Sequence, residues 1–177
     1  MKTSNKTKIT SLVYAAVCLA LCLVLPFLTG QIPQVGNALC PMHIPVLLAG
    51  FLCGPWWALA VGLVAPLLRH TLFLMPPLMT AIAMSFELAA YGLISGLMYR
   101  KLPKTTGNIY VSLLTAMAGG RVIWGIARLA LTGVTGKPFT FAMFLAGAFT
   151  SAIPGIIVHI LLIPVLVMAL KKANIIK

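Results

Sequence analysis

Hydrophobic residues occur in long blocks along the chain, and short breaks rich in proline, glycine and lysine separate these blocks. The first block covers residues 10–28, about 28 Å of helix at 1.5 Å per residue, which matches the hydrocarbon thickness of a bilayer. Three further blocks of similar length cover residues 56–74, 78–99 and 109–131. The pattern predicts a transmembrane helix in each of these four ranges.

Two other apolar blocks are less regular. Residues 42–53 are too few to cross a bilayer untilted, and the break at Gly54-Pro55 predicts a tight hairpin with the next block. Residues 139–170 are enough for one tilted or kinked helix, and Pro154-Gly155 is the expected bend. These two ranges bring the predicted number of transmembrane helices to six.

The amino-acid composition excludes a soluble protein. Hydrophobic residues make up 61% of the chain and charged residues 8%, whereas soluble domains have roughly 45–50% and about 25%. A water-soluble surface cannot be built from so few polar side chains. The chain is therefore predicted to be an all-α integral membrane protein, a six-transmembrane-helix bundle that forms a single membrane domain over residues 1–177.

Positive charge is concentrated where the apolar blocks end. The formal net charge is +12, and nine of the cations flank the first block, the gap after residue 99 or the last block: Lys2, Lys6, Lys8, Arg100, Lys101, Lys104, Lys171, Lys172 and Lys177. Among the breaks on the other side of the predicted bundle, only the last one carries a cation, Lys137. Because cytoplasmic loops carry an excess of lysine and arginine, both termini are predicted to be cytoplasmic. The same distribution argues against nucleic acid as a partner.

The four cysteines are accompanied by no CxxC pattern and no Cys/His pairing. They are expected to act as small buried apolar side chains rather than as metal ligands. The sequence therefore predicts no metal site and no cofactor.

Four charged residues fall inside the predicted helices: Arg69, Glu87, Arg121 and Arg128. An ionisable residue in a bilayer costs roughly 2.5–3.5 kcal/mol on insertion scales, so it usually faces the bundle interior and has a partner. If Glu87 neutralises one arginine, about two positive charges remain uncompensated in the outer half of the bundle. An anionic ligand satisfies such charges through bidentate hydrogen bonds, so the chain predicts a pocket for a small molecule bearing a carboxylate or a phosphate.

Other residues are expected to complete this pocket. Arg121 and Arg128 are seven residues apart, two turns on one helix face, and Trp124 lies between them on the same face. The break over residues 29–41 is rich in hydrogen-bonding groups. The predicted substrate-binding residues are Arg69, Glu87, Tyr91, Arg121, Trp124, Arg128, Gln34 and Asn37.

Several of these residues have an alternative role that involves no ligand. Arg69 and Arg128 could extend to the outer lipid headgroups while Arg121 simply pairs with Glu87. Trp124 could be an interface anchor. The three histidines also have alternatives to ligand binding. His70 faces either headgroups or the pocket, whereas His43 and His159 are expected to be hydrogen-bonded structural residues.

The chain resembles the substrate-binding S components of energy-coupling factor (ECF) vitamin transporters, over nearly its whole length. The small-residue pair Ala16 and Ala20 in the first helix, which permits close helix approach, is one shared feature, and the polar loop after that helix is another. The segment His43-Ile44-Pro45-Val46-Leu47-Leu48-Ala49-Gly50, continuing through Gly54-Pro55 to Gly62, looks like the hairpin of the riboflavin and pantothenate branches.

The resemblance implies a function and a set of partners. Such a subunit binds a vitamin or related nutrient from outside a prokaryotic cell with high affinity and hydrolyses nothing itself. It docks through Ala16 and Ala20 onto a transmembrane coupling subunit that carries two cytoplasmic ATPases. The absence of a Walker-type phosphate loop in this chain agrees with ATP being hydrolysed by partner subunits. The resemblance places the protein in the plasma membrane, in contact with lipid.

The arginine excess favours pantothenate as the nutrient, although folate, a queuosine precursor or another anion also fits, and riboflavin would need a larger aromatic-lined site. A stand-alone secondary transporter of a small organic anion is the main alternative function, and the lack of an evident inverted repeat weakens it. An intramembrane enzyme is disfavoured, because one glutamate with scattered histidines supplies neither a nucleophile with its base nor a metal site.

Overall fold

A computed structural model of the chain describes residues 2–29, 32, 36, 38–136, 139–148 and 150–176. Within these ranges all regular secondary structure is helical, which confirms the predicted all-α class. In the same part of the chain, five helices are long and apolar enough to cross a membrane.

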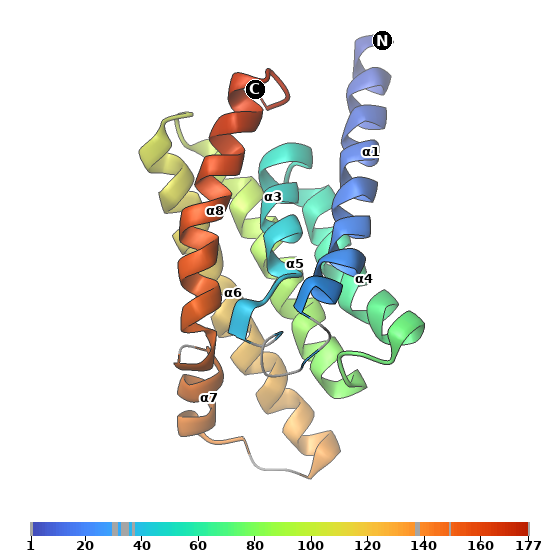
Figure 1. The fold of residues 1–177 in the computed structure, drawn as a ribbon, viewed down its shortest axis with the longest axis vertical. Helices are drawn as coiled ribbons and strands as arrows, with labels where there is room; N and C mark the ends of the chain where they lie inside the picture. The colour runs from blue at the N-terminus through green and yellow to red at the C-terminus, as the bar shows by residue number, and fades with distance from the viewer. Residues whose placement is uncertain are drawn as a thin grey trace.

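The helices form an elongated bundle (Figure 1). Their bounds, in chain order, are α1 (Lys2–Val24), the 3-10 segment η1 (Leu25–Thr29), α3 (His43–Cys53), α4 (Pro55–Phe73), α5 (Leu78–Lys101), α6 (Thr106–Thr135), α7 (Phe141–Ala148), the 3-10 segment η2 (Thr150–Ala152) and α8 (Ile153–Lys172).

Two helices are longer than the apolar blocks that predicted them. Helix α1 begins at Lys2 rather than at residue 10, because the polar residues before the block include neither proline nor glycine. Helix α6 begins at Thr106, where the hydroxyl of Thr105 accepts a hydrogen bond from the backbone N–H of Asn108, and it ends before Gly136 in a left-handed conformation. Capping residues, not hydrophobicity, fix the two ends of α6.

The C-terminal apolar block differs from its prediction. Instead of one bent helix over residues 139–170, the structure has the short helix α7, the segment η2 and then the longer helix α8. Pro154 does not bend a helix but lies in the first turn of α8, where its missing N–H leaves no hydrogen bond broken.

The α3–α4 hairpin packs closely against α5. Gly54 joins the two helices with φ of +85°, a conformation that favours glycine. A methyl group at Gly92 of α5 would lie 2.5 Å from the carbonyl oxygen of Ala58, and one at Gly62 of α4 would lie 2.4 Å from that of Leu88. Small residues thus let α4 and α5 approach at backbone distance, as is common in membrane bundles.

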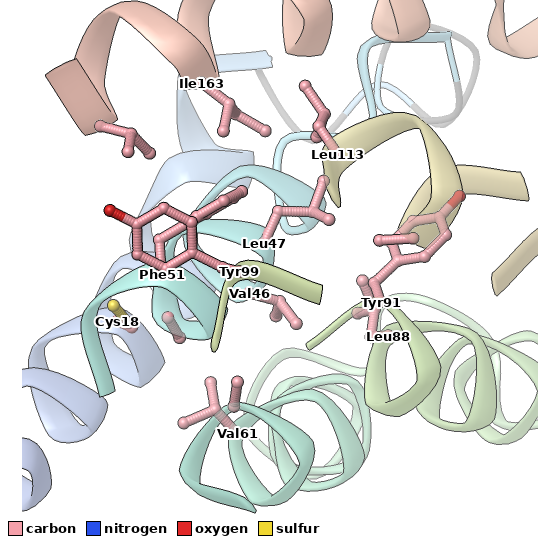
Figure 2. Packing of buried hydrophobic residues seen from close by; sticks show 14 of the residues in the cluster. Cys18, Val46, Leu47, Phe51, Val61, Leu88, Tyr91, Tyr99, Leu113 and Ile163 are labelled. Carbon is pink, nitrogen blue, oxygen red and sulfur yellow. The ribbon is translucent and has the colours of Figure 1, made fainter. Parts of the chain in front are cut away.

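The apolar core lies between α3 and its neighbours. Figure 2 shows Val46 and Leu47 of α3 surrounded by side chains from other helices, including Leu113 of α6 and Ile163 of α8. These four side chains are fully buried. Helix α3 is too short to span a bilayer untilted, but it is held in the centre of the bundle by this packing.

Both ends of the chain lie at the same end of the bundle, where the α5–α6 connection is also found (Figure 1). Lys104 in that connection donates to the carbonyl oxygen of Tyr99 and lies over the Tyr99 ring, and Lys171 of α8 donates to the carbonyl oxygen of Lys104. Desolvation, together with the nearby charges of Lys171 and Arg100, lowers the pKa of Lys104. This basic end contrasts with the opposite end, where the α4–α5 connection and α7 lie.

Candidate ligand-binding pocket

A pocket of about 470 Å³ is lined in part by the α4–α5 connection and α7, two elements that lie at the end of the bundle opposite the chain termini (Figure 1). Its volume falls in the range of sites that bind small molecules. The chain before α3, the end of α4, the α4–α5 connection and helices α5, α6 and α7 supply its walls. The lining residues are Pro26, Ile32, Gly36, Cys40, Pro41, Met42, His43, Arg69, Met75, Pro76, Pro77, Thr80, Met84, Glu87, Arg121, Trp124, Arg128 and Gly147.

Glu87 of α5 and Arg121 of α6 form an ion pair at the floor of this pocket. Nη1 of Arg121 lies 2.9 Å from Oε1 of Glu87, and the two residues are 8% and 1% exposed. Burial of a charge costs free energy that a partner at this distance offsets. The sequence leaves the arginine partner of Glu87 open, and the structure identifies it as Arg121.

His43, at the start of α3, approaches the same carboxylate oxygen. Its Nε2 lies 3.4 Å from Oε1 of Glu87, and the residue is 2% exposed. Neither ring nitrogen has a hydrogen bond within the described ranges. The sequence favours a hydrogen-bonded structural role for His43, whereas the structure places it in the pocket wall with unsatisfied polar atoms. Its position at the junction of the polar loop and a short helix is the sequence signal for this placement.

Tyr91 and His159 lie behind His43 and do not line the pocket. The ring of Tyr91 meets that of His43 edge-on with centroids 5.2 Å apart, and the ring of His159 stacks on His43 at 5.9 Å. A methyl group at Gly120 of α6 would overlap the Tyr91 ring, so glycine there admits the ring. Tyr91, predicted from sequence to bind substrate, supports His43 in the structure.

Arg69 of α4 lines the pocket but is fixed by protein groups. It is 3% exposed, and Nη1 donates to the carbonyl oxygen of Leu23 at the end of α1. Its guanidinium also lies 5.1 Å from the ring of Phe27 and 5.2 Å from that of Phe73. Pro26, three residues after Leu23, has no N–H that could donate to this carbonyl. Arg69 therefore does not extend to headgroups in this structure.

Arg128 and Trp124 occupy the same face of α6, two turns and one turn beyond Arg121. The Arg128 guanidinium lies 5.9 Å from the Trp124 ring and 5.6 Å from the Phe139 ring, and both Arg128 and Trp124 are half-buried. A methyl group at Gly147 of α7 would lie 2.6 Å from the Trp124 indole. The glycine thus makes room for the indole at the pocket wall.

Of the other polar residues considered for the pocket, His70 lies outside it. Nδ1 of His70 lies 2.8 Å from the carbonyl oxygen of Pro76, and His70 does not line the pocket, so it joins α4 to the α4–α5 connection. Gln34 and Asn37 lie outside the described residues. Cys40 follows them and lines the pocket, and burial raises the pKa of its thiol.

Ala16 and Ala20 lie on the exposed face of α1. The buried face of the same helix carries Ala15, Cys18 and Cys22, which pack in the core. The two alanines are therefore available to another helix, on a surface separate from the pocket.

Comparison with known proteins identifies a family. The sequence profile of the family described as "ECF transporter, substrate-specific component" matches residues 10–167, which is most of the chain. No curated protein and no solved structure matches.

Proposed function

The chain belongs to the family of ECF transporter substrate-specific components, and on that premise we propose that its pocket captures a small anionic nutrient from outside the cell. A substrate-specific membrane subunit of an ECF importer binds the cargo, while ATP is hydrolysed by other subunits. The pocket described above is the feature of this chain that suits such a task.

The observation that carries the proposal is the charge balance around the pocket. Arg69, Arg121 and Arg128 line it with Glu87, which is the chain's one acidic residue, so two positive charges are in excess. Guanidinium groups in a site of low dielectric attract carboxylates and phosphates and bind them with two parallel hydrogen bonds. A cationic nutrient would be repelled by the same groups.

The proposed orientation places the pocket on the outer side of the plasma membrane of a prokaryotic cell. Lysines and arginines gather at the end of the bundle that holds both termini and the α5–α6 connection. The positive-inside rule assigns that end to the cytoplasm. In this arrangement the membrane domain has six helical segments: α1, α3, α4, α5, α6 and the α7–α8 pair.

The proposed partners are a transmembrane coupling subunit and two cytoplasmic ATPases, which is the general mode of action of the family. The exposed face of α1 around Ala16 and Ala20 is the proposed docking surface. Small side chains support this assignment because they allow the backbones of two helices to approach closely.

Pantothenate is the nutrient that we favour. Its carboxylate suits an arginine, and its hydroxyl and amide groups suit a floor made of Glu87 and His43. A vitamin of a different shape that carries the same groups would make the same contacts.

The proposal is tested with the tagged full-length chain expressed together with the coupling subunit and ATPases of its own organism. The expected result is co-purification of the four subunits and ATP-dependent uptake of radiolabelled pantothenate or another water-soluble vitamin. Rapid concentrative uptake by the chain alone, without any ATPase, would instead identify a secondary transporter.

A further inference from the structure

The pocket has two ends that differ in burial. Arg121, Glu87 and His43 at the floor are each less than a tenth exposed, whereas Arg128 is half-buried. Arg121 and Arg128 are seven residues apart on one face of α6, which is about 10 Å at 1.5 Å per residue. A ligand of vitamin size can therefore contact both ends at once.

The floor is unsuited to an anion. The guanidinium of Arg121 already has the Glu87 carboxylate at 2.9 Å. An incoming carboxylate would compete with Glu87 for this cation and would lie beside a buried negative charge. Two carboxylates beside the same guanidinium in a low dielectric repel each other strongly.

The floor instead requires uncharged hydrogen-bonding groups. Nδ1 of His43 and Nε of Arg121 are buried and lack hydrogen-bond partners within the described part of the chain, and Nε2 of His43 has only the Glu87 carboxylate, at 3.4 Å. Such atoms are costly to leave unpaired, and a ligand that pairs them recovers that cost. A group that both donates and accepts, such as a hydroxyl, an amide or a ureido group, suits the carboxylate of Glu87 together with these nitrogens.

The half-buried end has the properties of an anion site. The guanidinium of Arg128 is close to the rings of Trp124 and Phe139 and has no ion-pair or hydrogen-bond partner among the residues that the structure describes. Stacking on aromatic faces restrains a guanidinium and leaves its N–H edge available. Arg69 is less available, because it is buried and already donates to the Leu23 carbonyl.

From this polarity we infer that the ligand carries a single anionic group, which binds Arg128, and an uncharged head with donors and acceptors, which binds Glu87 and His43 at the floor. The inference rests on the proposed function and adds the ligand class and its orientation. It also assigns different roles to the two arginines of α6. Arg128 binds the anionic group of the ligand, whereas Arg121 holds the carboxylate of Glu87 in place.

The test measures equilibrium binding to the purified full-length chain in lipid nanodiscs. The probes are two acids that carry an uncharged polar head, pantothenate and biotin, and their neutral counterparts, panthenol and biotinamide. At least one acid is expected to bind about 100-fold more tightly than its counterpart, the size of one charge-assisted pair. Quenching of Trp124, in a chain with Trp56→Phe and Trp57→Phe, provides the readout at the anion end.

Two variants assign this ratio to one end of the pocket. Arg128→Gln is expected to reduce the ratio of acid to neutral affinity to about threefold or less, because its amide cannot replace the charge. The double variant Glu87→Gln with Arg121→Gln removes both floor charges together, so no buried charge is left alone. It is expected to weaken the acid and its counterpart alike, by about tenfold, and to keep their ratio.

Three results would overturn the inference: equal affinity for acid and counterpart, loss of the ratio in the double variant with retention in Arg128→Gln, or no binding of any of the four probes. The proposed function is judged separately. Assembly with the coupling subunit and ATP-dependent uptake, found without these binding properties, would contradict only the ligand class and orientation. Failure of assembly and uptake would contradict the function itself.

Discussion

Nη1 of Arg121 lies 2.9 Å from Oε1 of Glu87, and this ion pair joins α6 to α5 at the floor of the pocket. The same two side chains line the pocket and join two helices, so changes to them affect both ligand binding and stability. Removing one partner leaves a buried charge unpaired, whereas removing both leaves none.

Arg121→Ala is therefore expected to destabilise the protein by about 3–5 kcal/mol, because Glu87 would keep its charge or take up a proton at a cost. Glu87→Ala is expected to have a similar effect through Arg121. The double variant Glu87→Ala with Arg121→Ala is expected to be markedly more stable than the sum of the two single changes predicts. Thermal unfolding of the four proteins in the same detergent measures this coupling, and additive effects would mean that the pair contributes little.

His43→Ala is expected to weaken ligand binding at least about tenfold, since His43 lies in the pocket wall and its Nδ1 has no hydrogen-bond partner among the described residues. His159→Ala is the matched control, because its ring stacks on His43 from outside the pocket. Binding of a vitamin that the unmodified chain binds gives the comparison. A larger loss for His159→Ala, with equal unfolding temperatures, would place the ligand elsewhere.

The fold class and most helix ranges follow from hydrophobicity alone, because a bilayer imposes a length and an apolar surface on every spanning helix. Helix α4, predicted over 56–74, runs from Pro55 to Phe73. The ends that were missed depend on local chemistry instead. Thr105 and Gly136 extend α6 by capping it, and Pro154 starts α8 rather than bending a longer helix.

The pocket is predictable only in part. Charged residues in apolar blocks identify Arg69, Glu87, Arg121 and Arg128, and all four line the same cavity. Which charges pair depends on the rotation of each helix about its axis, and the sequence does not specify this rotation. The same reason explains why Tyr91 was expected in the pocket and lies behind His43.

Arg69 is expected to hold the end of α1. Arg69→Gln removes the charge and the pairing with both phenylalanine rings, and a shorter amide reaches the Leu23 carbonyl less well. The backbone amides of Phe27 and Leu28 are then expected to exchange with deuterium about tenfold faster, which corresponds to one lost contact of this kind. Exchange followed by mass spectrometry on the peptide over residues 19–29 checks this.

The matched control for that experiment is Arg128→Gln, which removes another pocket arginine that is far from α1 in the chain. Its peptide over residues 19–29 is expected to exchange at the original rate. Faster exchange in both variants would indicate a general loss of stability, and unchanged exchange in both would show that Leu23 does not depend on Arg69.

Replacement of both Ala16 and Ala20 by phenylalanine separates binding from transport. The two alanines lie on the exposed face of α1, so larger side chains there disturb no packing within the bundle. We expect vitamin binding by the isolated variant to stay within about twofold, since exposed substitutions rarely change stability much. Uptake by the assembled transporter is expected to fall at least about tenfold, because two phenylalanine rings keep a partner helix from close approach.

Ile126→Phe on α6 is the control for that variant, because it adds an aromatic ring to another side chain, 59% exposed, on the outside of the bundle. Uptake by this control is expected to match the unmodified protein. If the Ala16 and Ala20 variant transports normally, the coupling subunit docks on a different surface. If it no longer binds the vitamin, the face of α1 and the pocket are not independent, and the small side chains of α1 must then also set the shape of the site through the Leu23 carbonyl and Arg69.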